Sequence, residues 1–381
     1  MQPAAKPGKE LQRKERVFGL DLMRAAAILL VLFAHCIWIF PSESGLLSQL
    51  LALAGFLGVE IFFVLSGFLI GRIIFRIYAT DEFTLLDIRR FLKRRWYRTL
   101  PNYYLILVVN LIIAYFIGYR VAHPEAYFVF MQNFAWPLLP FFPESWSLSV
   151  EEFAYLILPF SLFVTMLLFR HKARMKVFLW TVLILIGASI LAKCSYHFTT
   201  RNASLSVWNI ALKSVVIYRL DAIFTGVLFS WIYCVYNAFW KRSRYNWLLA
   251  GIILIGFFSI GIGWFHLTID LQPFFWNVFY LPAVSVAIAC FLPVLSEWKT
   301  ERSTISKPVT FISLISYSIY LLHYSVVLQL LKQVFDTASF TTLETGVFTA
   351  AYVAITIVLS YLLYRFYELP MMNRRERKPV I

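Results

Sequence analysis

Long apolar stretches divide the chain, and short polar segments separate them. Ten stretches approach the roughly 20 apolar residues that a helix needs to cross a bilayer. They lie at approximately 17–40, 51–70, 103–117, 151–169, 177–192, 215–237, 247–265, 276–294, 309–331 and 345–364. Because these runs are continuous and do not alternate with polar residues, they predict helices and not the strands of a membrane barrel. The expected fold is all-α, a polytopic integral membrane protein of about ten transmembrane helices.

Basic residues favour one side of these spans. If the N-terminus is cytoplasmic, 28 of the 35 Lys and Arg residues fall in cytoplasmic segments, and this bias predicts that both termini are cytoplasmic. Five basic residues are expected on the outer side: Arg120, Lys193, Arg201, Lys213 and Lys332. The chain then divides into a basic tail at 1–16, a transmembrane domain at 17–366 and a second basic tail at 367–381. The expected location is the inner (plasma) membrane, crossed many times.

Composition excludes several classes of protein. With 60% hydrophobic and 14% charged residues, the chain has too little polar surface for a water-soluble globule. The net charge of +15 does not indicate nucleic-acid binding, because the basic residues form short clusters between apolar runs. The four cysteines have no metal-ligand spacing, and Walker, nucleophile-elbow and HExxH motifs are absent. We therefore expect a lipid bilayer as a partner, no nucleic acid and no metal.

The first apolar run, GLDLMRAAAILLVLFAHCIW at 19–38, contains three ionisable residues. Arg24 and His35 are eleven residues apart, close to three helical turns, so they project from one face about 16 Å apart along the axis. Asp21 lies one turn before Arg24, close enough to pair with it. The plainest interpretation is a packing salt bridge and a histidine at the headgroup level. Ionisable groups within a span more often mark a pathway or a reactive site.

The cytoplasmic segment RRFLKRRWYRTLP, at 89–101, is strongly basic. Such a cluster can bind anionic lipid headgroups. Because arginine also holds phosphate bidentately, a phosphate-rich ligand is the sharper hypothesis for this segment.

Polar groups recur near the expected outer face. In WSLSVEEFAYLILP, at 146–159, Ser149 and Glu152 have the spacing of a helix capping box. Capping does not require Glu151, and two adjacent carboxylates beside aromatic side chains also suit a hydroxylated ligand such as a carbohydrate. His323, in SYSIYLLHYSV at 316–326, is expected at a depth similar to that of His35. A pair of histidines at one depth favours an outward-facing polar site over a single interhelical hydrogen bond.

These segments, in this order, resemble the membrane-bound acyltransferase 3 family, integral membrane O-acyltransferases that modify glycans and some small molecules. The resemblance extends from FGLDLMRAAAILLVLFAH through GVEIFFVLSGFLI, RRWYRTLP, WSLSVEEFAYLILP and YRLDAIFTG to SYSIYLLH and YRFYELP. One departure is Glu60, where many members carry aspartate, which keeps the carboxylate. The hydrolase-like domain that larger members carry is absent from this sequence, and we expect a stand-alone member.

The family's motifs match this sequence residue by residue. The arginine and histidine separated by ten residues match Arg24 and His35, and the Arg-x-x-Arg motif matches Arg95 and Arg98. The serine-glutamate segment and the later polar positions match Ser147, Glu151, Glu152, Arg219, Asp221 and His323.

The resemblance implies an O-acyltransferase with cytoplasmic acyl-CoA, most often acetyl-CoA, as co-substrate and no permanently bound cofactor. The implied acceptor is a hydroxyl of an extracytoplasmic glycan such as O-antigen, exopolysaccharide or another envelope polysaccharide. Arg24, Arg95 and Arg98 would bind the acyl-CoA. His35 would be the general base, because an imidazole titrates near neutral pH, and a covalent acyl-histidine is the rival chemistry.

The remaining matched residues are assigned by the same resemblance. Arg24 and Glu151 would also be catalytic, and Glu151, Glu152 and Asp221 would line the outer mouth. Supporting roles fall on Asp21, Ser147, Arg219 and His323. Two other hypotheses stay open: acyl transfer to a secreted small molecule, and a transporter or flippase, although no inverted repeats with matched broken helices are seen.

Overall fold

The computed structural model describes residues 16–40, 45–79, 83–169, 173–299 and 304–374, and this part of the chain is helical, with no strand. Ten helical segments are long and apolar enough to cross a membrane: Phe18–Trp38, Leu46–Tyr78, Leu85–Phe116, Pro143–Leu168, Arg174–Thr200, Val216–Val235, Arg244–Trp264, Phe275–Glu297, Ser306–Val334 and Thr342–Arg374. The all-α fold and the predicted number of spans are thereby confirmed.

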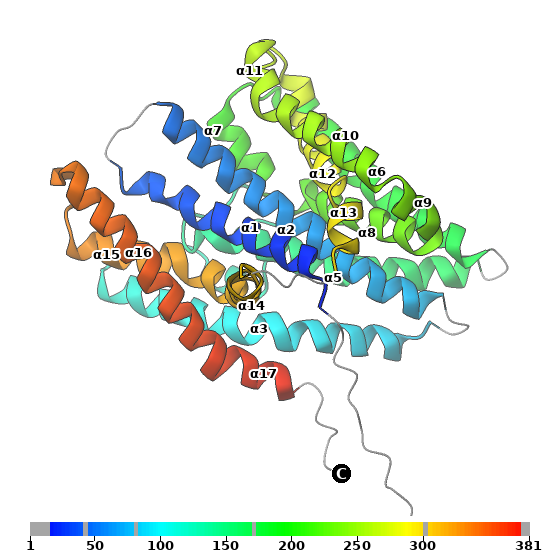
Figure 1. The fold of residues 1–381 in the computed structure, drawn as a ribbon, viewed down its shortest axis with the longest axis horizontal. Coiled ribbons are helices and arrows are strands. Elements are labelled where there is room, and N and C mark those ends of the chain that lie inside the picture. The colour runs from blue at the N-terminus through cyan, green and yellow to red at the C-terminus, as the bar shows by residue number, and fades with distance from the viewer. Residues whose placement is uncertain (1–15, 41–44, 80–82, 170–172, 300–303, 375–381) are drawn as a thin grey trace, which may run out of the picture.

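Figure 1 shows how the helices are arranged. The spans Leu46–Tyr78, Leu85–Phe116 and Arg174–Thr200 are each a single α-helix, whereas 3-10 or π-helical turns extend or interrupt the other spans. The α-helices are α1 (Phe18–Ala34), α2 (Leu46–Tyr78), α3 (Leu85–Phe116), α4 (Pro124–Phe128), α5 (Trp146–Leu168), α6 (Arg174–Thr200), α7 (Leu205–Trp208), α8 (Leu220–Val235), α9 (Asn237–Arg242), α10 (Arg244–Gly256), α11 (Ile262–Trp264), α12 (Leu281–Ala289), α13 (Leu292–Glu297), α14 (Ser306–Leu322), α15 (Gln329–Val334), α16 (Thr342–Leu363) and α17 (Leu369–Arg374). The 3-10 segments are η1 (His35–Trp38), η2 (Pro143–Ser145), η4 (Val216–Tyr218) and η8 (Thr337–Ser339). The π-helical segments are η3 (Asn209–Lys213), η5 (Phe257–Gly261), η6 (Phe275–Tyr280), η7 (His323–Leu328) and η9 (Tyr364–Glu368).

Helix α2 lies at the centre of the bundle, packed along α1 on one side and α8 on the other. Its contact with α8 is a close approach of two backbones. A Cβ added to Gly67 would lie 1.9 Å from the carbonyl oxygen of Ile223, and one added to Gly226 would lie 2.1 Å from that of Val64. Small residues of this kind let membrane helices pack closely where no hydrophobic force drives them together.

Gly67→Ala is expected to lower the free energy of unfolding by at least the roughly 1–3 kcal/mol typical of overpacking, because the added methyl meets backbone and not a side chain that can move aside. The detergent-purified protein is heated and then run on size-exclusion chromatography, and the measurement is the temperature at which its monodisperse peak is lost. Gly187→Ala on α6 is the matched control, since a Cβ there meets nothing within 4 Å. Equal melting of the two variants would contradict this close packing.

Helix α3 differs from its predicted form. The sequence indicated a span at 103–117 after a basic cytoplasmic segment, whereas the structure has one helix from Leu85 to Phe116 that includes the segment. Thr84 caps it, accepting a hydrogen bond from the backbone N–H of Asp87 while the Asp87 carboxylate accepts one from the N–H of Thr84. Arginine and lysine are good helix formers, so the basic sequence continues the helix.

Helix α5 begins inside the protein. The segment before it is buried, including Glu144 and Ser145, and the Asn133 amide donates hydrogen bonds to the carbonyls of Trp146 (3.0 Å) and Ser214 (2.6 Å). The backbone N–H of Val216 donates to the Asn133 carbonyl at 3.0 Å. Residues near the start of α5 therefore lie deeper than an outer loop would place them.

The two expected tails lie mostly outside the described residues. Of the tail at 367–381, the structure describes the part up to Arg374, which continues the last helix. Of the tail at 1–16 it describes only Arg16.

Candidate active site

Asp21 is an anchor at the start of α1. Its carboxylate accepts two hydrogen bonds of 2.8 Å from the Arg16 guanidinium and one of 2.8 Å from the hydroxyl of Ser313 on α14. Arg24 is farther away, with 3.9 Å between its guanidinium nitrogen and the nearest Asp21 oxygen. The predicted Asp21–Arg24 pair is thus present but loose, which leaves most of the Arg24 guanidinium available for another anion.

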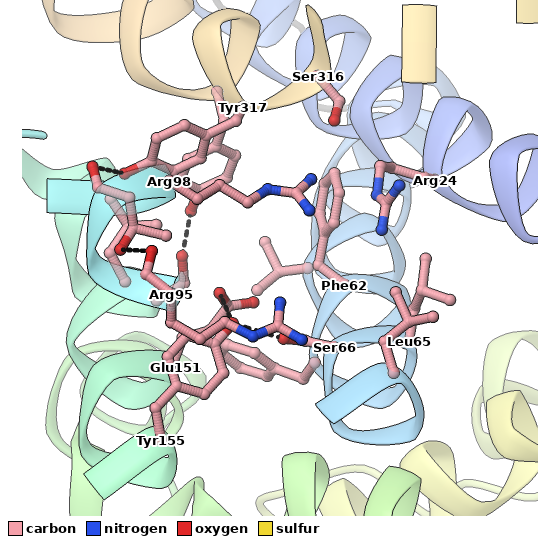
Figure 2. A pocket seen from close by; sticks show the side chains of 17 residues that line it. Arg24, Phe62, Leu65, Ser66, Arg95, Arg98, Glu151, Tyr155, Ser316 and Tyr317 are labelled. Atoms are coloured by element: carbon pink, nitrogen blue, oxygen red, sulfur yellow. Dashed lines mark hydrogen bonds between the residues drawn. The ribbon is translucent and has the colours of Figure 1, made fainter. Parts of the chain in front are cut away.

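A cavity lies between α1, α2, α3, α5 and α14 and contains about 760 Å³ of empty space, its opening included. Three of the predicted residues, Arg24, Arg95 and Arg98, point their guanidinium groups into it from two helices (Figure 2). None of the six ion pairs among the described residues involves Arg95 or Arg98, so neither guanidinium has a carboxylate within ion-pair distance. We call the part of the cavity that Arg24, Arg95 and Arg98 face the arginine end.

Glu151 lies in the wall of the same cavity, held by neighbouring hydroxyls. Its carboxylate accepts a hydrogen bond of 2.8 Å from Tyr155, whose hydroxyl is also 2.7 Å from that of Ser66. The Arg95 guanidinium lies 5.6 Å from the centre of the Tyr155 ring. This network keeps Glu151 oriented beside the arginines (Figure 2).

The expected position of the two glutamates is corrected by this geometry. Glu151 and Glu152 were predicted to line the outer mouth, yet Glu151 shares the arginine end, and Glu152 accepts a 2.7 Å hydrogen bond from Thr99, next to Arg98. The cause is the buried start of α5. The capping-box interpretation is also wrong, because α5 begins at Trp146, after Ser145, and Ser149 lies in its interior.

Two predicted histidines meet at the far end of α1, which we call the histidine end. His35 is the first residue of η1, and His323 is the first residue of η7. His323 Nε2 lies 3.3 Å from His35 Nδ1, and the two rings are almost perpendicular, with 4.6 Å between their centroids. His323 is fully buried, whereas His35 is partly exposed. The prediction that the two lie at one depth is therefore confirmed by direct contact.

Tyr320 stands between the cavity and the histidines. It lines the cavity, and its ring centroid lies 5.8 Å from that of His323. Its hydroxyl is 2.6 Å from that of Ser147 and 3.0 Å from the carbonyl oxygen of Glu144. The cavity thus reaches from the three arginines to a tyrosine that touches the histidine pair, and His35 itself is not in its wall.

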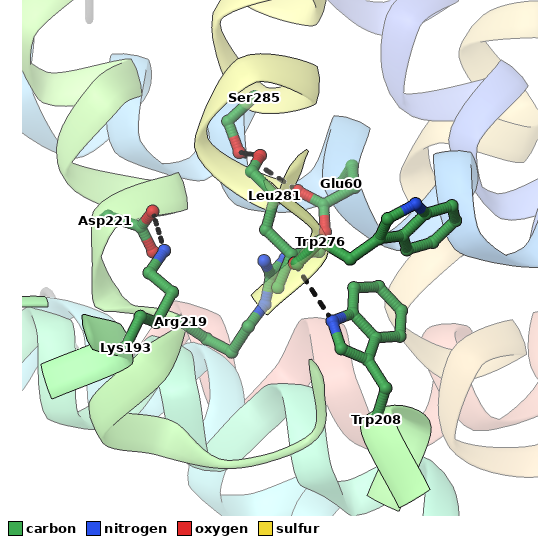
Figure 3. A network of polar contacts seen from close by, with 8 residues as sticks. All are labelled: Glu60, Lys193, Trp208, Arg219, Asp221, Trp276, Leu281 and Ser285. Atoms are coloured by element: carbon green, nitrogen blue, oxygen red, sulfur yellow. Dashed lines mark hydrogen bonds and ion pairs between the residues drawn. The ribbon is translucent and has the colours of Figure 1, made fainter. Parts of the chain in front are cut away.

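Arg219 and Asp221 belong to a separate, buried charge cluster (Figure 3). Arg219 forms an ion pair with Glu60, whose other oxygen accepts a 3.1 Å hydrogen bond from Ser285. Asp221 pairs with Lys193 at 2.5 Å, and both are fully buried. The expectation that Asp221 lines the outer mouth is therefore wrong. The cluster contacts the cavity only indirectly, through Phe63, whose ring centre lies 5.4 Å from the Arg219 guanidinium.

Lys213 adds a cation near this cluster, just outside the sixth span. Its ammonium donates a 3.1 Å hydrogen bond to the side chain of Asn209. Burial disfavours the charged form and, together with the nearby Arg219, lowers the pKa of Lys213 to about 8. Lys213 is therefore still mostly protonated at neutral pH.

Several residues of the site and of the buried charge cluster were missed from the sequence. Lys193 was expected just beyond a span, but α6 continues to Thr200 and buries it; its position at the edge of an apolar run was a usable signal. Tyr155, Tyr320 and Glu144 gave none, because tyrosines are frequent throughout this chain and Glu144 lies in a segment expected to be an outer loop.

Comparison with known proteins gives a consistent result. A family model described as an acyltransferase domain matches residues 17–365. O-acetyltransferase OatA of Staphylococcus aureus is 26% identical, over 96% of this chain and 60% of its own length. A putative peptidoglycan O-acetyltransferase of Bacillus subtilis, YrhL, is 26% identical over 83% of this chain and 49% of its own length. A second putative O-acetyltransferase of S. aureus is 23% identical, over 92% and 56%.

The chain therefore spans about half to three fifths of the length of these relatives. No solved structure gives a significant match.

Proposed function

This chain belongs to the acyltransferase domain family, and from that premise we propose that it is a multi-pass membrane O-acyltransferase which moves an acetyl group from acetyl-CoA to a hydroxyl of an extracytoplasmic glycan. The observation that carries the proposal is the cavity that connects three arginines with the tyrosine next to a histidine pair. The arginine end of the cavity has the chemistry that a phosphate-bearing acyl donor requires, and the histidine pair next to Tyr320 has the chemistry that a proton transfer requires.

The arginine end suits the donor. Coenzyme A carries several phosphates, and a guanidinium binds phosphate through two parallel hydrogen bonds. Arg24, Arg95 and Arg98 face one space and have little competition from carboxylates. With the phosphates bound there, the pantetheine arm would extend along the cavity toward Tyr320.

The histidine end suits the chemical step. His35 Nδ1 lies 2.9 Å from the carbonyl oxygen of Val31, and since a carbonyl can only accept, Nδ1 carries the proton of the neutral ring. His35 Nε2 then holds a lone pair. In the proposed step it takes the proton of the acceptor hydroxyl while that oxygen bonds to the thioester carbon. The carbon–sulfur bond breaks, and the departing coenzyme A thiolate takes the proton back from His35.

The names of the relatives support the acyl group and the acceptor class. OatA is named an O-acetyltransferase and YrhL a putative peptidoglycan O-acetyltransferase. We therefore favour acetyl as the group transferred and a polysaccharide of the cell envelope as the acceptor.

The direct test compares cells that make the protein with cells that do not. Mass spectrometry of the extracted envelope glycans should show an ester-linked acetyl mass only where the protein is made, and that mass should disappear after mild alkali. In membranes from these cells, labelled acetyl-CoA should transfer its label to added glycan. The absence of both signals, with the protein present and folded, would refute the proposed function.

Substitution of the cavity arginines should weaken donor binding. Arg95→Ala and Arg98→Ala are each expected to raise KM for acetyl-CoA by about 10- to 100-fold, because each removes a charge-assisted hydrogen bond worth roughly 1.5–3 kcal/mol. Arg90→Ala is the control, since Arg90 is on the same helix but its side chain is 68% exposed. An unchanged KM in both cavity variants would show that the phosphates bind elsewhere.

A further inference from the structure

We infer that Glu144 is a positioning residue for the histidine pair, because its carboxylate holds the π-helical turn that begins at His323. This inference rests on the proposed function for its catalytic meaning. Glu144 is 5% exposed and lies in η2, directly before α5. It is thus a buried acid from a segment that is far from His323 in sequence.

The carboxylate holds one residue of the turn through two hydrogen bonds. One oxygen, Oε1, accepts from the backbone N–H of Ser325 at 3.0 Å and from its hydroxyl at 2.5 Å. The other oxygen, Oε2, is buried and has no hydrogen-bond partner among the described residues. Glu144 therefore acts on the turn through Oε1 alone.

The turn itself is irregular. Helix α14 ends at Leu322, and residues His323–Leu328 form the π-helical η7. The Tyr320 carbonyl, one turn before His323, lies 2.8 Å from His323 Nδ1, and the Ile319 carbonyl lies 3.2 Å from the same atom. π-helical turns of this kind are frequent at functional sites, and this one begins at a histidine whose imidazole contacts backbone carbonyls of α14.

Those carbonyls determine the tautomer of His323. Because they only accept, His323 Nδ1 carries the proton and Nε2 holds a lone pair. That lone pair lies 3.3 Å from His35 Nδ1 and favours a proton there, as does the Val31 carbonyl. His35 Nε2 is thereby kept free to accept a proton. The hydrogen bonds between Glu144 and Ser325 therefore affect the base, His35, through the position of His323.

Glu144 also binds a residue of α14 that precedes the turn. Its backbone carbonyl accepts a 3.0 Å hydrogen bond from the hydroxyl of Tyr320, the last aromatic residue before His323. One residue of η2 therefore contacts the chain on both sides of His323, through Tyr320 of α14 and through Ser325 of η7. Loss of the carboxylate would release the second contact only.

The experiment uses full-length Glu144→Ala and Glu144→Gln variants in membrane vesicles. The glutamine amide oxygen can occupy the place of Oε1 and keep both bonds from Ser325, whereas alanine cannot. We expect Glu144→Ala to lower kcat by roughly 10- to 100-fold, part of what general acid–base catalysis contributes, with KM for acetyl-CoA unchanged. Glu144→Gln should stay within about threefold of the wild-type rate.

Glu368→Ala is the matched control. Glu368 is as buried as Glu144, and it likewise accepts a short hydrogen bond, 2.6 Å, from a serine of α14, Ser318, but on the opposite side of His323 in sequence. Glutamine as inactive as alanine would show that the negative charge or proton transfer at Oε2 matters, and would overturn the inference. Equal loss of rate in Glu144→Ala and Glu368→Ala, in proportion to lost stability, would overturn it as well.

A second readout does not depend on any acceptor. ¹⁵N NMR of histidine-labelled protein distinguishes the two neutral tautomers, and spectra of His35→Gln and His323→Gln assign the signals. The Nδ1–H form of His323 should dominate in wild type and Glu144→Gln and be lost in Glu144→Ala. If wild type transfers no acetyl group but this pattern is seen, the proposed function fails and the positioning role stands. A tautomer unchanged in Glu144→Ala refutes the role itself.

Discussion

Replacement of His35 by alanine is expected to abolish acetyl transfer and leave the protein folded. General acid–base catalysis contributes typically 10²–10⁴-fold, and a hydroxyl without a base is a weak nucleophile, so the expected fall in kcat is about 1,000-fold or more. Because His35 is partly exposed and contacts chiefly His323 and Tyr324, its removal costs little packing. The measurement is the rate of ester formation in vesicles, beside the ester-linked acetyl content of the envelope glycans.

His197→Ala is the control for this variant. His197 is a histidine of α6 that shares a 3.1 Å hydrogen bond with Asn277 and lies away from the cavity. It should retain the wild-type rate. A His35→Ala protein that still transfers acetyl groups at more than about a hundredth of that rate would remove His35 from the mechanism.

The His35→Ala variant also distinguishes direct transfer from a covalent acyl-histidine intermediate. Direct transfer predicts no label on the protein when labelled acetyl-CoA is supplied without an acceptor. An acyl-histidine intermediate predicts label on wild type that is absent from His35→Ala. We expect no stable label, because the assignment of His35 Nε2 as a base requires only a proton to move.

Arg219→Met is expected to destabilise the fold by about 3–5 kcal/mol, the cost of leaving one partner of a buried ion pair alone. Its partner Glu60 is 1% exposed and would keep only the hydrogen bond from Ser285. Most of the protein should be lost from the membrane or aggregate in detergent, and the activity per folded molecule should change little. Heating followed by size-exclusion chromatography measures this loss.

Removal of both charges should restore much of the stability. In Glu60→Gln/Arg219→Met neither charge is left unpaired, and well-packed replacements of buried pairs are often neutral. Arg90→Met is the control for loss of an exposed pair, because the Arg90–Asp87 bridge is 3.7 Å long and solvated, so its loss should cost under about 1 kcal/mol. If Arg219→Met melts at the same temperature as the wild type, the buried charge cluster does not stabilise the fold.

The number of spans and the presence of functional residues in the first span could be predicted from the sequence. A helix needs a long apolar run to cross the hydrocarbon, and an ionisable group within such a run stands out in the sequence. Arg24 lies on α1 and His35 directly follows its last residue, and Arg95 and Arg98 lie three residues apart on α3. These are local relations, so residue spacing is sufficient to find them.

Relations that depend on tertiary structure could not be predicted. Glu151 was placed at the wrong depth because nothing in the local sequence shows that the segment before α5 is buried by Asn133 and the 214–216 region. Asp221 was expected at a mouth because its segment lies near the expected outer face and matches a family motif, and nothing local shows that Lys193 is its buried partner. In both cases a distant backbone or charge determines the environment, and hydropathy carries no information about it.

Tyr320 has a consequence for the membrane as a permeability barrier. In the proposed function an acyl group crosses the membrane, and ions must not follow it. Tyr320 lies in the cavity wall, and its hydroxyl is hydrogen-bonded to Ser147 and to the backbone carbonyl of Glu144. In the proposed function, a two-carbon group on the thin pantetheine arm would need a narrower path past this ring than a hydrated ion needs, so the ring would help to keep ion gradients while esters are made.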